Sequence, residues 1–69
     1  RTRFEALRAW RADVAKEHAL PAYVIFHDAT LAMMARDRPA SLDALAGISG
    51  VGAKKLQAYG PDILAVLAR

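Results

Sequence analysis

The amino-acid sequence predicts an all-α fold, a compact bundle of five or six short helices. Alanine, the residue with the highest helix propensity, supplies 16 of the 69 residues. Apolar residues recur at helical spacing along most of the chain, and capping residues, glycines or prolines separate the apolar stretches. Only residues 23–26 resemble a strand, and no other segment could pair with them, so a β-sheet is not expected.

The first helix is expected to begin near Arg3, because Thr2 and Glu5 have the spacing of a capping box. Pro21 should end this helical stretch near Ala19 and start the next element in its first turn. Apolar residues of the first helix recur on one face with a period of 3.6 residues: Phe4, Leu7, Val14 and Ala15, with Trp10 at the edge.

Two helices are expected in the centre of the chain. Residues 23–26 should form a short buried helix despite their two β-branched side chains. Asp28 is a suitable N-cap for a helix over residues 29–36, and Arg38 should end it because the residue before Pro39 avoids the α region. The core stripe of this second helix comprises Leu31, Met34 and Ala35.

Ser41 should cap a short helix that runs to Ala46, with Gly47 in the C′ position. The next helix is expected over residues 51–59. The Gly-Pro pair at 60–61 then either kinks this helix or ends it and starts another, which decides between five and six helices. The final stretch carries a last apolar face: Ile63, Leu64, Val66 and Leu67.

The composition indicates one small domain, residues 1–69, which does not begin with methionine and is expected to be a piece of a longer protein. The net charge is +3, and it is concentrated toward the two ends. Residues 1–17 and 54–69 each carry +2, whereas residues 18–53 carry −1. A calculated pI of about 9.8 fits a nucleic-acid partner, although a charge of this size does not establish one by itself.

Several functional classes are not expected because the chain lacks the residues they need. It has no cysteine and two histidines, too few and wrongly spaced for a metal site, so no metal or other cofactor is expected. No nucleophile–base set or paired-carboxylate site is present, so the domain is not expected to be an enzyme or to bind a small molecule. No apolar run approaches the length of a membrane span, so no membrane partner is expected.

The segment Gly50-Val51-Gly52 is the strongest functional signal. Glycine allows φ > 0 and a close approach of the backbone to a ligand, and the first turn of a helix presents N–H groups that can bind phosphate. Lys54 and Lys55 follow in that turn, where a cation opposes the helix dipole and therefore indicates an anionic partner. The same segment also fits a simple interhelix turn with positive φ at both glycines, with Lys55 laying its stem over the bundle.

Three further residues are singled out by their positions. Tyr23 could stack on a nucleic-acid base, or it could be a half-buried core tyrosine. Arg8 flanks the apolar stripe of the first helix, so it is free to meet a phosphate. Arg11 projects into the middle of that stripe, so we expect a structural arginine that is paired with a carboxylate such as Asp28 or Asp43.

Three groups of residues form a specific spaced pattern over nearly the whole chain: Leu7-Arg8-Ala9-Trp10-Arg11; Pro21 to Phe26 with Asp28, Thr30 and Leu31; and Arg38-Pro39, Ser41-Leu42, Leu45, Ile48, Gly50-Val51-Gly52, Lys55-Leu56 and Tyr59-Gly60. This pattern resembles the helicase-and-RNase-D C-terminal (HRDC) domain family. The central group, which reads Tyr-Val-Ile-Phe-x-Asp, is closer to the form found in RecQ-type DNA helicases than to that of RNase D.

The resemblance implies a compact five-helix bundle that is a non-catalytic accessory domain of a RecQ-like, ATP-dependent DNA helicase. Domains of this family bind DNA weakly or dock on protein surfaces, and they tune which DNA structures the helicase engages. The Gly-Val-Gly turn resembles half of a helix-hairpin-helix, which grips the phosphate backbone through main-chain N–H groups. An intracellular location, cytoplasmic or nucleoid-associated in a bacterium, is then expected.

Two functional hypotheses follow. In the first, the domain modulates substrate selection in DNA repair and recombination by weakly binding single-stranded or partly duplex DNA through a set of surface residues: Arg8, Tyr23, Gly50, Gly52, Lys54 and Lys55. In the second, the acidic middle segment, with Asp37 and Asp43, docks on the helicase core or a neighbouring domain, with little direct DNA contact. An RNA-processing parent protein is a third option.

Overall fold

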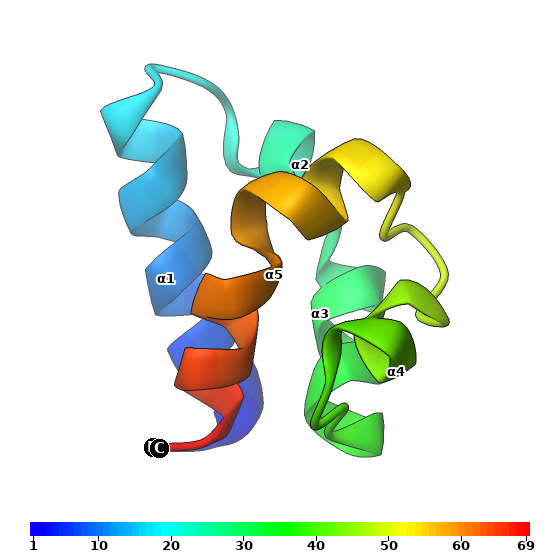
Figure 1. Ribbon diagram of the computed structural model, residues 1–69. Helices are drawn as coiled ribbons and strands as arrows, with labels where there is room; N and C mark the ends of the chain where they lie inside the picture. The colour runs from blue at the N-terminus through cyan, green and yellow to red at the C-terminus, as the bar shows by residue number, and fades with distance from the viewer.

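The computed structural model describes all 69 residues as five helices without a strand. The helices are α1 (Arg3–Glu17), α2 (Ala22–Ile25), α3 (Asp28–Asp37), α4 (Leu42–Ala46) and α5 (Ala53–Leu67). Helix α1 packs against α2, α3 and α5, and α4 packs against α5, so that the two ends of the chain lie together (Figure 1). The all-α bundle predicted from the sequence is therefore confirmed.

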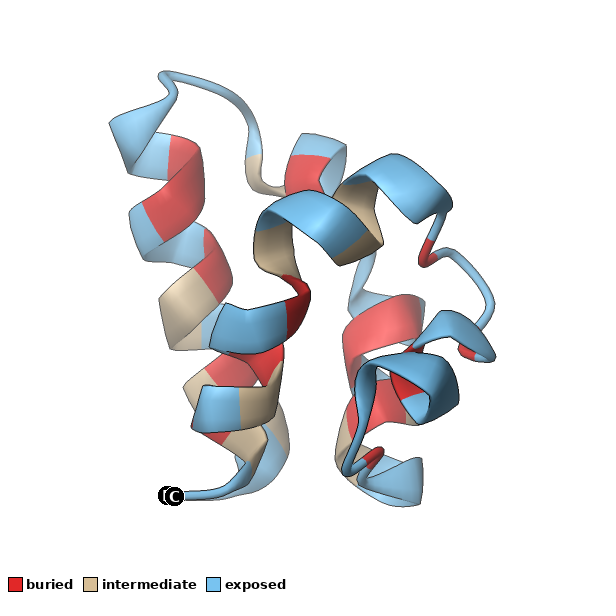
Figure 2. Cartoon of the chain, viewed as in Figure 1, coloured by how far each residue is buried: buried red, intermediate tan, exposed pale blue.

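Every helix contributes to one continuous core, and the buried residues face inward from all sides of the bundle (Figure 2). The large side chains with almost no solvent exposure are Leu7 from α1, Ile25 and Phe26 at the end of α2, Leu31 and Met34 from α3, Leu45 from α4 and Ile63 from α5. Burial of this apolar surface is the main stabilising contribution to a chain this short.

The capping box predicted at the start of α1 is present. The Glu5 amide donates to Thr2 Oγ1 and the Thr2 amide donates to Glu5 Oε1, both at 3.1 Å. Hydrogen bonds from the Thr2 backbone and then from its side chain lower the pKa of the Glu5 carboxyl. Helix α1 ends at Glu17, earlier than expected, because Ala19 adopts a left-handed conformation with φ 54° before Pro21.

The predicted N-cap of α3 is wrong by one residue. His27 occupies the cap position without a side-chain hydrogen bond, and Asp28 is the first residue of the helix. The Asp28 carboxylate does not cap the helix because it pairs with Arg11 instead. At the other end, α3 stops at Asp37, and Arg38 takes a left-handed conformation (φ 48°) before Pro39.

Helix α4 starts as the sequence indicated, since the Ala44 amide donates to Ser41 Oγ at 3.1 Å. Gly47 was expected in the C′ position, and this expectation is wrong by one residue. It is the C-cap and has φ −77°, so no positive φ requires a glycine at this position.

Residues 53–67 form one helix that continues through Pro61 and changes direction midway, so the Gly-Pro pair kinks α5 and the bundle has five helices (Figure 1). The helix begins at Ala53, two residues later than expected. Gly60 is buried beside α4, and a Cβ placed there would lie 2.7 Å from Leu42 Cδ2. A glycine at this kink therefore allows α4 to pack closely on α5.

Candidate nucleic-acid interface

The two glycines before α5 have different structural roles. Gly50 has φ 95°, and a Cβ added there would overlap Thr30 Oγ1. Gly52 has φ −78° and is the N-cap of α5, and nothing lies within 4 Å of the position where its Cβ would be. The prediction of positive φ at both positions is therefore wrong for Gly52. Only Gly50 is required by the geometry of the turn.

The N-terminus of α5 is uncapped. The backbone amides of Ala53, Lys54 and Lys55 donate to no acceptor in the protein, and Gly52 has no side chain with which to cap them. By contrast, α1 and α4 are capped by the hydroxyls of Thr2 and Ser41. An exposed helix N-terminus attracts a negative charge, so the free amides at the start of α5 can donate hydrogen bonds to a phosphate oxygen.

The two lysines in the first turn of α5 differ in their surroundings. Lys54 is exposed, and its ammonium forms neither an ion pair nor a hydrogen bond. Lys55 is half-buried, and its Nζ lies 5.1 Å from the centroid of the Phe26 ring in a cation–π contact. Lys55 therefore covers the core near Phe26, whereas Lys54 is the lysine available to a phosphate.

Tyr23 is exposed rather than half-buried, since 62% of its surface is accessible to solvent. Its ring stacks on the ring of His27, with centroids 6.2 Å apart and an interplanar angle of 24°. Helical spacing does not predict this pair, because the chain leaves α2 at Ile25 and is extended at Phe26 and His27. A flat aromatic pair on an exposed surface is suited to stacking with a base.

Phe26 connects α2 to the first half of α5. Its ring centroid lies 6.0 Å from that of Tyr59 and 6.2 Å from that of Trp10, and Lys55 contacts the same ring. Trp10 is therefore part of the partly buried core, as the sequence indicated. Helix α2, which carries Tyr23, and the first turns of α5 consequently occupy the same end of the bundle (Figure 1).

Arg8 is not brought into contact with the other predicted DNA-binding residues. It is exposed on α1, and its guanidinium carbon lies 5.8 Å from the centroid of the Phe4 ring on the same helix. It forms no hydrogen bond or ion pair with a residue of α2 or α5. Its participation in the same surface as Tyr23 and Lys54 stays a prediction.

Arg11 is buried among the core helices and has two partners. Its Nη1 lies 2.7 Å from Asp28 Oδ1 and donates to the backbone oxygen of Phe26 at 2.9 Å. The Nε atom is buried without a hydrogen-bond partner. Asp28 is thus the carboxylate that Arg11 reaches, and Asp43 takes no part. The arginine joins α1 to the end of α2 and the start of α3.

The two aspartates of the docking hypothesis lie on different elements. Asp37, at the end of α3, accepts hydrogen bonds from Arg36 at 2.8 and 3.2 Å, and these bonds lower the pKa of the Asp37 carboxyl. Asp43 is exposed in the first turn of α4, where the helix dipole stabilises a negative charge. Asp37 therefore has a local partner whereas Asp43 forms no ion pair or side-chain hydrogen bond, and the role of both in docking stays a prediction.

The structure contains no group of three or more His, Cys, Asp or Glu side chains that could hold a metal ion. None of its helices combines the length and apolar character that crossing a membrane requires.

Comparison with known proteins identifies the family. The HRDC domain family matches residues 1–67. The chain belongs to the HRDC family. A solved structure of this family, HRDC domain 3 of RecQ from D. radiodurans, superposes with a TM-score of 0.90 and 40% sequence identity, and the match covers 94% of this chain and 86% of that one. Membership of the HRDC family, which the spaced motifs predicted, is therefore confirmed.

The HRDC domain is also similar to segments of two kinds of bacterial helicase. It is 48% identical over 58 residues to the ATP-dependent DNA helicase UvrD2 of Mycobacterium tuberculosis. It is 42% identical over 57 residues to the ATP-dependent DNA helicase RecQ of Bacillus subtilis. These matches cover 84% and 83% of this chain but only 8% and 10% of the helicases. The resemblance to UvrD2 was not foreseen from the sequence.

Proposed function

We propose that this HRDC domain is a non-catalytic accessory domain of an ATP-dependent DNA helicase and that it weakly binds single-stranded or partly duplex DNA. The binding surface is the end of the bundle where α2 meets the first turn of α5, and binding there modulates the DNA substrates that the helicase selects. The names of the RecQ and UvrD2 relatives support a helicase parent.

The uncapped start of α5 is the observation that carries the proposal. Three backbone amides there have no protein acceptor, and the unpaired Lys54 ammonium stands in the same turn. A phosphate oxygen bound at this turn would accept hydrogen bonds from the amides and would be attracted by both the helix dipole and Lys54. Gly50 sets the path of the chain into this turn, since its φ of 95° is open mainly to glycine.

The exposed Tyr23–His27 pair supports a single-stranded ligand. Base stacking on an aromatic side chain is independent of sequence and requires bases that are free of a partner strand. The Tyr23–His27 pair and the start of α5 lie at the same end of the bundle (Figure 1), so one DNA strand could place a phosphate on α5 and a base on the aromatic pair. The expected binding is weak, because only about two to four phosphates would be contacted. On single strands, the slope of log K against log[salt] is roughly −0.7 for each phosphate contact.

Replacing Lys54 with glutamate tests the proposal. Binding of a fluorescein-labelled single-stranded oligonucleotide, measured by anisotropy at several salt concentrations, is expected to weaken, and the slope of log K against log[salt] should become about 0.7 less negative. Lys16→Glu is the matched control, because Lys16 is an exposed lysine in the last turn of α1 and forms no ion pair. Equal losses for both variants would show that only net charge matters, and that result would refute a site at α5.

A further inference from the structure

A second basic surface lies at the opposite end of the bundle, where the chain ends meet (Figure 1). Arg3 is fixed at this end, because its Nε donates to the backbone oxygen of Ala35 at 3.0 Å and thereby joins α1 to the last turn of α3. Four exposed arginines at this end have no carboxylate within ion-pair distance: Arg1, Arg3, Arg38 and Arg69.

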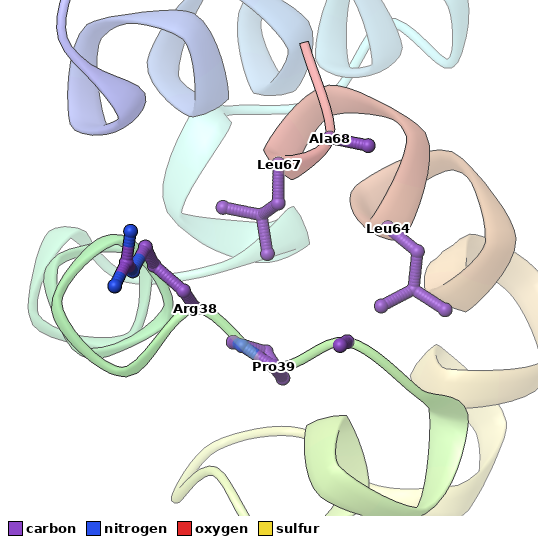
Figure 3. Close-up of a pocket in the computed structure, with 6 residues that line it drawn as sticks. Arg38, Pro39, Leu64, Leu67 and Ala68 are labelled. Carbon is purple, nitrogen blue, oxygen red and sulfur yellow. The ribbon is translucent and has the colours of Figure 1, made fainter.

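Two grooves open among these arginines. The first is lined by three arginines and three smaller residues: Arg1, Thr2, Arg3, Ala6, Val66 and Arg69. The second has a volume of about 200 Å³ and is mostly apolar: Arg38, Pro39, Ala40, Leu64, Leu67 and Ala68. Figure 3 shows the two leucine side chains pointing from α5 toward the linker that contains Pro39. The last turn of α5 separates the grooves, so a ligand lying across it would contact both.

The chemistry of the two grooves differs from that of the DNA surface. Guanidinium groups bind carboxylates in a planar, two-point geometry. Unpaired arginines beside an apolar groove can therefore bind a peptide that carries carboxylates and one apolar side chain. No aromatic residue lines either groove, so bases would have no stacking surface there. A nucleic acid would also leave the leucine wall of the second groove without an apolar partner.

We propose that this end of the domain binds an acidic segment of a partner protein, with one apolar anchor residue of that segment seated between Pro39 and the leucines of α5. The flanking carboxylates pair with the arginines around the groove. The surface shares no residue with the start of α5 or with Tyr23. The proposal can therefore fail while DNA binding holds, and the reverse is also possible.

The test uses a fluorescein-labelled ten-residue peptide in which aspartate and glutamate surround one leucine and one phenylalanine. Anisotropy is expected to show saturable binding that weakens with salt. Arg38→Glu and Ala40→Glu each weaken binding by about fivefold or more, because each places a negative charge beside the acidic ligand. Both positions are exposed, so thermal unfolding of these variants should match that of the wild type. Lys16→Glu, which lies outside both grooves, should bind as the wild type does.

Four results would overturn the proposal. The first is the absence of saturable binding at millimolar peptide. The second is equal binding of a control peptide in which serine replaces the leucine and phenylalanine, since charge alone would then explain the attraction. In the third, an unlabelled oligonucleotide displaces the peptide and Lys54→Glu weakens peptide binding, which would assign the peptide to the DNA surface. The fourth is a dimer in sedimentation that Ala40→Glu dissociates, which would assign the groove to a second copy of the chain.

Discussion

Replacing Gly50 with alanine is expected to lower the free energy of unfolding by about 3 kcal/mol. A left-handed backbone costs a non-glycine residue about 1–2 kcal/mol. Overpacking adds about 1–3 kcal/mol, because the new methyl group would overlap the Thr30 hydroxyl, and Thr30 is itself buried. Thermal unfolding followed by circular dichroism measures the effect, and the midpoint of a domain of this size should fall by about 4–8 °C per kcal/mol.

Gly52→Ala is the matched control for this prediction. Gly52 has φ −78° and open space around its Cβ position, so alanine fits there without strain. The expected loss is about 1 kcal/mol or less, which reflects the poorer N-cap preference of alanine. Equal losses at the two glycines would contradict the assignment of Gly50 as the residue that fixes the turn.

Replacing Arg11 with alanine is expected to destabilise the fold by about 2–4 kcal/mol. The substitution removes the donor to the Phe26 carbonyl, and an unsatisfied buried acceptor costs about 1–3 kcal/mol. It also leaves a cavity where the buried stem of Arg11 packed, since the residue is only 7% exposed. Asp28→Ala should cost less, because the Asp28 side chain is 65% exposed and water replaces part of its interaction.

The readout separates a structural arginine from a DNA contact. Thermal unfolding should change strongly for Arg11→Ala, whereas oligonucleotide affinity, measured below the unfolding midpoint, should change little. Arg11→Met keeps an apolar stem without the charge, so its stability should lie between those of the wild type and the alanine variant. An affinity loss with an unchanged melting temperature would contradict the structural role.

The sequence was most informative where a local rule decides the structure. The capping box at Thr2 and the cap at Ser41 depend on residues within one turn, and both appeared as expected. The assignment of Asp28 as a cap failed because a distant residue, Arg11, competes for its carboxylate. Whether α5 continues through Pro61 was likewise open, because a Gly-Pro pair is compatible with either a kink or a helix end.

The candidate site was only partly predictable for the same reason. Two lysines at the start of a helix look alike in sequence, and the ring of Phe26 distinguishes them by holding Lys55. The two glycines also look alike, and their different φ values follow from the contact of the turn with α3 at Thr30. The arginines at the other end come from residues 1, 3, 38 and 69, and only the folded chain brings them together.

If the free amides at the start of α5 bind a phosphate, titration with a single-stranded oligonucleotide at low salt should change the chemical shifts of those backbone amides. Gly52→Ser supplies a control. Gly52 has φ −78° and ψ 169°, close to the values of −74° and 161° at the capping residue Thr2. A serine hydroxyl at this position should therefore occupy an amide of α5 and weaken DNA binding without loss of stability.

The largest shifts are expected at the amides of residues 53–55, with further shifts at Tyr23 and His27. Residues 38–40 and 64–69 should be unaffected by the oligonucleotide. Shifts confined to α1 or to the arginine-rich end would contradict the claim, as would the absence of any shift from a folded domain at low salt.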